Sequence, residues 1–175
     1  MLLVLLLGVA DFGRVFNAGI ITEATARNAA EAAAQEYLQV RRATAPALAA
    51  DFDRISAVAQ AKVCQEAERL PNRQVVGATC SMPYTAVCVH DDPAELTNYT
   101  TCGAGAGSAP PECSELHKSW PSLWTPGMLA SVEVRVCYRF DTLIPLSDLH
   151  LPFGNGLTIG SVWLQRDRVF SVADY

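Results

Sequence analysis

The spacing of apolar residues separates a helical first part of the chain from a second part rich in strands. From residue 2 to about residue 70, apolar residues recur every three or four positions, as in amphipathic helices. From residue 74 onward they form short β-branched runs or alternate with polar residues, as in strands. We predict an α+β fold, in which a long N-terminal helix and a second helix pack on one side of a small antiparallel sheet of three or four strands.

The first helix is expected to run from the apolar segment at residues 2–10 to about Tyr37. Its apolar positions recur at helical spacing, and those in the second half are mostly small: Phe12, Phe16, Gly19, Ile20, Ala26, Ala30, Ala33 and Tyr37. Small residues let another helix approach closely, as in pairs of membrane helices. The alternative is that alanine is frequent here because it is the best helix former.

The segment at residues 2–10 contains only apolar residues and glycine. Crossing a bilayer takes about 20 apolar residues, so this segment corresponds to about half a span. We expect it to be the C-terminal half of a membrane anchor whose start is missing. A cleaved signal peptide and a buried helix of a soluble protein are the alternatives. The residues expected to serve membrane insertion or assembly are Leu2, Leu5, Leu6, Gly8, Val9, Asp11, Phe12, Gly13, Arg14 and Phe16.

A second helix is predicted to begin at Thr44-Ala45-Pro46, where a hydroxyl cap is followed by proline in the first turn. Its apolar face is expected to consist of Leu48, Phe52, Ile55, Ala59, Val63 and Leu70. Pro71 cannot continue a helix and ends the pattern.

Four runs are predicted to form strands. The runs at residues 74–80 and 85–89 are short, rich in β-branched residues and separated by Met82-Pro83, which favours a hairpin. Residues 132–140 alternate strictly, which predicts a strand with one apolar face toward the core and one polar face toward solvent. The run at residues 157–164 is expected to end at Gln165. We expect it to pair in antiparallel orientation with the strand at residues 132–140.

The chain contains six cysteines and no Cys-x-x-Cys pair: Cys64, Cys80, Cys88, Cys102, Cys113 and Cys137. An even number at wide spacing favours disulfides over a metal site, and hence an oxidising location outside the cytoplasm. The alternative is free, buried thiols in a reducing compartment. We expect the short loop from Cys102 to Cys113 to be closed first, because it would staple the Gly- and Pro-rich loop predicted at residues 90–127.

The residues that could carry chemistry form no catalytic constellation. His90-Asp91-Asp92 could contact a divalent metal, but a polar turn before Pro93 explains it better. No nucleophile elbow or phosphate-binding loop is present, so we predict no catalytic residue, metal or cofactor. The net charge of −5, without a basic cluster, argues against nucleic acid as a partner.

Two tryptophans in the predicted loop, Trp120 and Trp124, are the candidates for partner contacts. The alternative is that they cover the edge of the protein's own core. Asp11 and Arg14 stand three residues apart at the end of the apolar segment. They could pair with each other or with a neighbouring subunit, and so set the axial register of an assembly.

Two segments of the chain resemble the TadE-like family of pilin-like proteins. The first is Gly8-Val9-Ala10-Asp11-Phe12-Gly13-Arg14, which is similar to the family's Gly-Val-acidic-Phe-Gly-Arg segment after its apolar span. The second is the strand at residues 134–140 followed by Leu143-Ile144-Pro145-Leu146. Together the matching regions span residues 2–40 and 131–166.

The resemblance implies a minor pilin or pseudopilin of a tight-adherence pilus or secretion system. Its partners would be the inner membrane, other pilin-like subunits and the assembly machinery. Residues 1–40 would form the anchor and assembly helix, and residues 41–175 a head outside the cytoplasm, on a protein that crosses the bacterial cell membrane once. A secreted or anchored binding module such as an adhesin is the alternative, and an extracytoplasmic enzyme is a third possibility.

Overall fold

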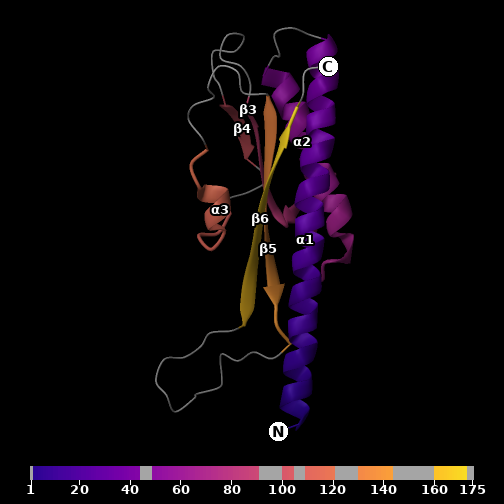
Figure 1. The fold of residues 1–175 in the computed structure, drawn as a ribbon, viewed down its shortest axis with the longest axis vertical. Coiled ribbons are helices and arrows are strands. Elements are labelled where there is room, and N and C mark those ends of the chain that lie inside the picture. The colour runs from indigo at the N-terminus through magenta and orange to yellow at the C-terminus, as the bar shows by residue number, and fades with distance from the viewer. Residues whose placement is uncertain are drawn as a thin grey trace.

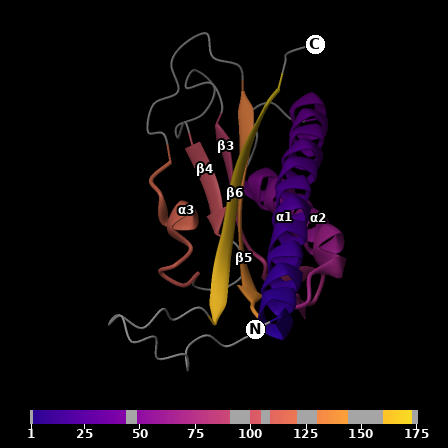
Figure 2. The same cartoon turned by 60° about the horizontal axis from the view of Figure 1, so that its bottom comes forward.

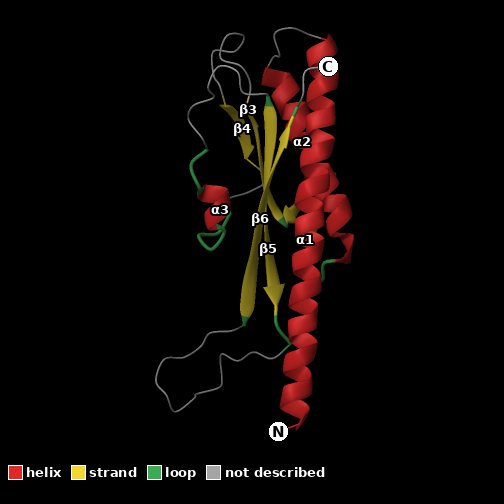
Figure 3. Cartoon of the chain, viewed as in Figure 1, coloured by secondary structure: helices red, strands yellow, loops and turns green. Residues whose placement is uncertain are grey.

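The computed structural model describes residues 2–43, 49–90, 100–104, 109–120, 130–143 and 160–172. The elements are α1 (Leu2–Ala43), α2 (Ala49–Glu66), a 3-10 turn η1 (Ala67–Arg69), β1 (Gln74–Val76), β2 (Thr79–Met82), β3 (Tyr84–His90), β4 (Thr100–Ala104), α3 (Ser114–His117), β5 (Ser131–Asp141) and β6 (Ser161–Ser171). The predicted α+β class is confirmed (Figure 3). The expected helix start at Thr44-Ala45-Pro46 and Leu48 lie outside the described residues.

Four strands form an antiparallel sheet in the order β4-β3-β5-β6, and β1 and β2 form a separate hairpin. β5 and β6 pair over their whole length, from Ser131 opposite Ser171 to Asp141 opposite Ser161. The predicted antiparallel pair is thus confirmed, although residues 157–159 lie outside the described residues. β6 also continues past Gln165, where the prediction ended it, because every residue to Ser171 finds a partner on β5.

Both helices cover one face of the sheet, as predicted (Figure 1, Figure 2). α1 packs on α2, β5 and β6, and α2 packs also on β3. The main core contains four residues of the predicted face of α2, valines of β3 and β5, and the alanines of α1: Ala26, Ala29, Ala30, Ala33 and Ala34. Leu70, which was predicted to belong to the same helix face, follows η1 and is buried in a second core cluster. These small side chains let α1 lie close to α2 and the sheet within a single chain.

The second face of β5 is exposed at Arg139, as the alternation predicted, but it is buried at the three polar positions before it. Glu133, Arg135 and Cys137 are all buried, with 6%, 2% and 0% of their surface exposed. The segment at residues 109–120, which contains α3, covers this face, and Cys137 is bonded to Cys113 within it. The prediction was wrong at these positions because the alternation gives no sign that a distant, Gly- and Pro-rich region covers this face of β5. That region was predicted to be only loop, but it also contains β4.

The predicted hairpin between residues 74–80 and 85–89 is also wrong. The turn lies inside the first run, where Gly77 has a φ of 63°, so that β1 pairs with β2. Glycine adopts this left-handed conformation without steric cost. β3 joins the large sheet instead, between β4 and β5.

All six cysteines form disulfides: Cys64–Cys80, Cys88–Cys102 and Cys113–Cys137. The first joins α2 to β2, and the second joins β3 to β4, where Cys88 and Cys102 are directly opposite. The expected Cys102–Cys113 bond is therefore wrong. Strand pairing, rather than closeness in sequence, selects the partner of Cys102.

Candidate membrane and assembly surface on helix α1

The N-terminal part of α1 exposes a continuous apolar surface. The helix has 42 residues, which corresponds to a length of about 63 Å. All side chains from Leu5 to Ala10 are exposed, so the predicted residues Leu5, Leu6, Gly8 and Val9 lie on this surface, and Leu2 lies in the first turn. Beyond Asp11 the head covers one side of the helix, and the opposite side remains open (Figure 1).

Three large side chains continue this surface along the head. Phe12, Phe16 and Ile20 are 73%, 64% and 53% exposed, and Gly13 is exposed beside them. Because they are four residues apart, they lie on one line of the helix, which we call the apolar ridge. An exposed apolar patch of this kind marks a surface that is covered by lipid or by another protein.

The exposed side of α1 changes its chemistry after Ile20. It continues through Ala24, Arg27, Glu31, Gln35 and Gln39, and all of these side chains except that of Ala24 are polar. The buried side over the same stretch consists mostly of alanines, together with Thr25 and Tyr37. One unbroken helix therefore has an exposed side that is apolar up to Ile20, apart from Asn17, and polar from Arg27.

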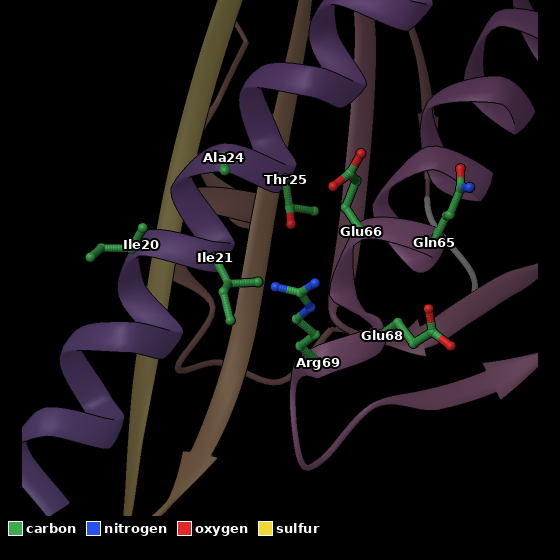
Figure 4. Close-up of a pocket in the computed structure, with 8 residues that line it drawn as sticks. All are labelled: Ile20, Ile21, Ala24, Thr25, Gln65, Glu66, Glu68 and Arg69. Carbon is green, nitrogen blue, oxygen red and sulfur yellow. The ribbon is translucent and has the colours of Figure 1, made fainter.

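A groove of about 450 Å³ separates the apolar ridge from α2 and η1 (Figure 4). Ile20, Ile21 and Thr25 line it on α1, and Glu66 and Arg69 face Ile21 and Thr25 from the other side. The hydroxyl of Thr25 lies in this groove, buried and without a hydrogen-bond partner among the described residues.

A second groove, of about 370 Å³, lies on the opposite flank of the ridge, between α1 and β6. Phe12, Phe16 and Ile20 line it together with Leu164 and Arg166. The ridge is thus bordered by a groove on each side, with Ile20 lining both. A ridge between two grooves is the surface relief through which helices pack against one another.

Asp11 connects α1 to the end of β5. Its carboxylate accepts hydrogen bonds from the backbone N–H of Leu143, at 3.1 Å to Oδ1 and 2.9 Å to Oδ2. Nη1 of Arg14 donates to Oδ1 at 2.9 Å, and the Arg14 guanidinium lies over the ring of Phe140, 5.1 Å from its centroid. The expected pairing of Asp11 with Arg14 is present within one chain.

A second polar contact connects α1 to β6 and was not foreseen from the sequence. The carboxylate of Glu23 forms ion pairs with Arg166, at 3.1 Å, and with Arg168. Both arginines lie beyond Gln165, where the predicted strand ends, but within the observed β6. Alternate residues of a strand share a face, and this spacing was the available signal that both could reach one partner.

On the opposite face of the sheet, a buried polar network holds residues 109–120 against β5. Glu133 contacts Nε2 of His90 at 3.1 Å and accepts from Nε of Arg135 at 2.8 Å. Arg135 also donates to the backbone oxygens of Glu115, at 3.1 Å, and Lys118. Burial alone would raise the pKa of Glu133, but the hydrogen bonds and charges of His90 and Arg135 outweigh it and lower that pKa below its ordinary value.

Trp120 belongs to this network. The Arg135 guanidinium lies 3.4 Å from the centroid of its ring, and the His90 ring centroid is 6.1 Å away. Trp120 thus covers part of its own sheet, which is the alternative to a partner contact, whereas Trp124 lies outside the described residues. His90 faces Glu133, and Asp91 and Asp92 are outside the described residues; within the described part, no three His, Cys, Asp or Glu side chains gather as a metal site would require.

Comparison with protein-family models, with curated proteins and with solved structures finds no match. The geometry itself defines the class: an α+β head closed by three disulfides, built on one helix that is long and apolar enough to cross a membrane. In the most apolar window of that helix, 17% of the residues are buried, whereas the core helix of a soluble protein is mostly buried.

Proposed function

We propose that this protein is a membrane-anchored, pilin-like assembly protein, a minor pilin or pseudopilin of a tight-adherence type pilus or secretion system. In this proposal the start of α1 lies in the inner membrane of a bacterium and the head lies outside the cytoplasm. The protein performs no catalysis. Its task is to dock α1 against the helices of other pilin-like subunits and against the assembly machinery.

The observation that carries the proposal is the change of character along the outer face of α1. The side chains from Leu5 to Ala10 are exposed all round the helix, as lipid contact requires. The apolar ridge from Phe12 to Ile20 lies beside the head, where it needs a protein partner rather than lipid. The polar residues from Arg27 onward need neither.

The two grooves beside the ridge support helix docking. A neighbouring helix that enters either groove would cover the ridge. Each square ångström of apolar surface buried in this way would contribute about 25 cal/mol of favourable free energy. Three disulfides hold the head, which favours a location outside the reducing cytoplasm. The resemblance of residues 8–14 and 134–146 to the TadE-like family supplies the particular system.

Site-specific photo-crosslinking in the native bacterium tests the proposal. A photoreactive phenylalanine analogue is placed at Phe12, Phe16 or Ile20, and at Glu31 or Gln35 as matched positions on the same exposed side of α1. We expect crosslinks to other pilin-like subunits from the ridge positions and none from the two polar positions. Equal crosslinking from both sets, or none from the ridge in cells that carry normal pili, contradicts the proposal.

A piliation assay separates assembly from the alternative of a binding module. Deleting the gene should abolish or strongly reduce surface pili, and the native chain should restore them. A variant with Phe16→Glu should fail to restore them while its head keeps its disulfides, because Phe16 is exposed and contributes little to the core. Normal piliation without the gene favours a binding module instead.

A further inference from the structure

A cleft of about 620 Å³ lies at the end of the large sheet where β5 and β6 run on beyond β3. The β3–β5 pairing ends at Tyr84 opposite Cys137, whereas the β5–β6 pairing continues to Asp141 opposite Ser161. The sheet therefore narrows, and residues 71–74 and the start of the 109–120 segment border the space that remains. Its volume is within the range of about 300–1,000 Å³ that is typical of small-molecule sites.

Disulfides fix two of the walls. Cys64–Cys80 ties β2 to α2 beside residues 71–74, and Cys113–Cys137 ties the 109–120 segment to β5. The backbone N–H of Asn72 also donates to the hydroxyl of Tyr138 at 3.3 Å. A cleft held in this way needs little rearrangement to receive a ligand, which lowers the entropic cost of binding.

The polar groups of the cleft are planar and already oriented by one another. Asp141 accepts from Nε of Arg139 at 2.9 Å and from Nδ2 of Asn72 at 2.9 Å. Nδ2 of Asn72 is also 3.2 Å from the backbone oxygen of Arg139. In these bonds Arg139 uses Nε, so its terminal nitrogens supply further donors. Planar amide, carboxylate and guanidinium groups bind pairs of adjacent hydroxyls, because each offers two donors or acceptors side by side.

Aromatic rings stand beside these polar groups. Trp163 lies directly opposite Arg139 across the β5–β6 pairing, and Tyr84 lines the cleft from β3. Both side chains are half-buried, so each combines a fixed position with an accessible surface. The face of a tryptophan ring carries partial negative charge and packs well against the C–H face of a sugar ring.

The formal charges of the lining residues cancel. Arg73 and Arg139 are balanced by Glu112 and Asp141. This balance argues against a phosphate or another anion, which would favour an excess of donors and positive charge. An uncharged ligand with many hydroxyl groups and apolar C–H faces fits both the balance and the aromatic rings.

We propose that this cleft binds a neutral oligosaccharide of β-1,4-linked sugars, because the rings of such a chain present the flat C–H faces that the half-buried ring of Trp163 would contact. One sugar ring stacks on Trp163, and its hydroxyls bind Arg139, Asp141 and Glu112. The proposal is independent of the role proposed for α1, because the cleft contains no residue of that helix. A carbohydrate-binding head could serve an anchored assembly protein or an anchored binding module equally.

Calorimetric titration of the full-length chain with chitotetraose and with cellotetraose tests this inference. The chain is held in a zwitterionic detergent, because detergents with sugar headgroups would compete for the cleft. We expect saturable binding of at least one tetrasaccharide by the native chain. Trp163→Ala should weaken that binding at least tenfold and Trp163→Phe less, since phenylalanine keeps an aromatic face. Trp120→Phe, outside the cleft, should leave the affinity unchanged.

Glu112→Gln provides a test that does not depend on the packing of Trp163. Glu112 is exposed, and only its backbone oxygen accepts the hydrogen bond from Gln165, so this variant should fold normally and bind at least threefold more weakly. Three results would overturn the inference. They are no binding of either tetrasaccharide by the native chain, unchanged affinity in both Trp163→Ala and Glu112→Gln, or occupation of the cleft by a proline-rich decapeptide that neither sugar displaces.

Discussion

The carboxylate of Asp11 binds the backbone N–H of Leu143, which is 132 positions later in the chain. This contact joins the first turns of α1 to the end of β5 and also receives Arg14. Asp11 therefore has its hydrogen-bond partners within its own chain. At the end of the apolar segment, Asp11 fixes the position of α1 relative to the end of β5.

Replacing Asp11 by asparagine should loosen this end of the head. The uncharged amide keeps one acceptor but loses the charge-assisted bonds, so we expect a loss of about 1–3 kcal/mol in the free energy of unfolding. The amide proton of Leu143 should also exchange faster with solvent, which hydrogen exchange measures locally. Glu31→Gln, on the exposed side of α1, is the control. If the Leu143 amide were equally protected in both variants, the contact would have no energetic role.

The stability of the head should fall in acid because of Glu133. Its pKa is lower in the folded chain than its ordinary value of 4.5, so the unfolded chain binds the proton more readily. The contribution of Glu133 is therefore fully present above pH 4.5 and is lost as the pH falls through the lower, folded pKa. Urea titrations at a series of pH values between 7 and 3 should show a shallower decline for Glu133→Gln than for the native chain. Identical slopes would show that Glu133 is not linked to folding.

The Cys113–Cys137 disulfide should control how the 109–120 segment is held. The bond closes a loop with a sequence separation of 24, for which loop-closure entropy predicts a contribution of about 3.5 kcal/mol. Changing both cysteines to serine should make the segment sensitive to limited proteolysis and leave β5–β6 protected. The matched control is the double serine variant at Cys64 and Cys80, which should leave this segment resistant. Cleavage at equal rates in both variants would contradict the assignment.

Membrane binding should depend on the side chains before Asp11. Leu6 is exposed on α1, and replacing it by glutamate places a charge where lipid contact is proposed. Flotation of the full-length chain with phospholipid vesicles should fall several-fold for Leu6→Glu. Gln35→Glu, which adds a charge to the polar part of the same helix, should float like the native chain. Equal flotation of all three chains would remove the anchor from the proposal.

The elements that periodicity predicted well are those whose pattern follows one dominant contact. The alternation at Val132, Val134 and Val136 and the helical spacing of Ile55, Ala59 and Val63 both arise from burial in one core, and both were predicted correctly. The hairpin was missed because a single glycine, Gly77, reverses the chain within a run that otherwise has strand character.

The candidate site was only partly predictable, for a physical reason. Exposed Phe12 and Phe16 and buried Ala26 and Ala30 belong to one continuous helical pattern, and only the position of the head decides which are covered. The contact of Asp11 with Leu143 depends on a backbone N–H, which any residue except proline provides, so no side chain in the sequence could indicate it. Likewise, the partner of Cys102 follows from the β3–β4 register.

α1 runs unbroken from Leu2 to Ala43. Its exposed N-terminal stem, residues 2–10, and the part that forms one wall of the core therefore belong to the same rigid helix. A pull on the stem is therefore transmitted directly to the packing of Ala26 and Ala33 against the sheet, without a hinge inside the helix to absorb it. Detaching the rod would open the core that it closes. The contacts that stabilise the folded head are therefore the same contacts that would bear a mechanical load on the helix.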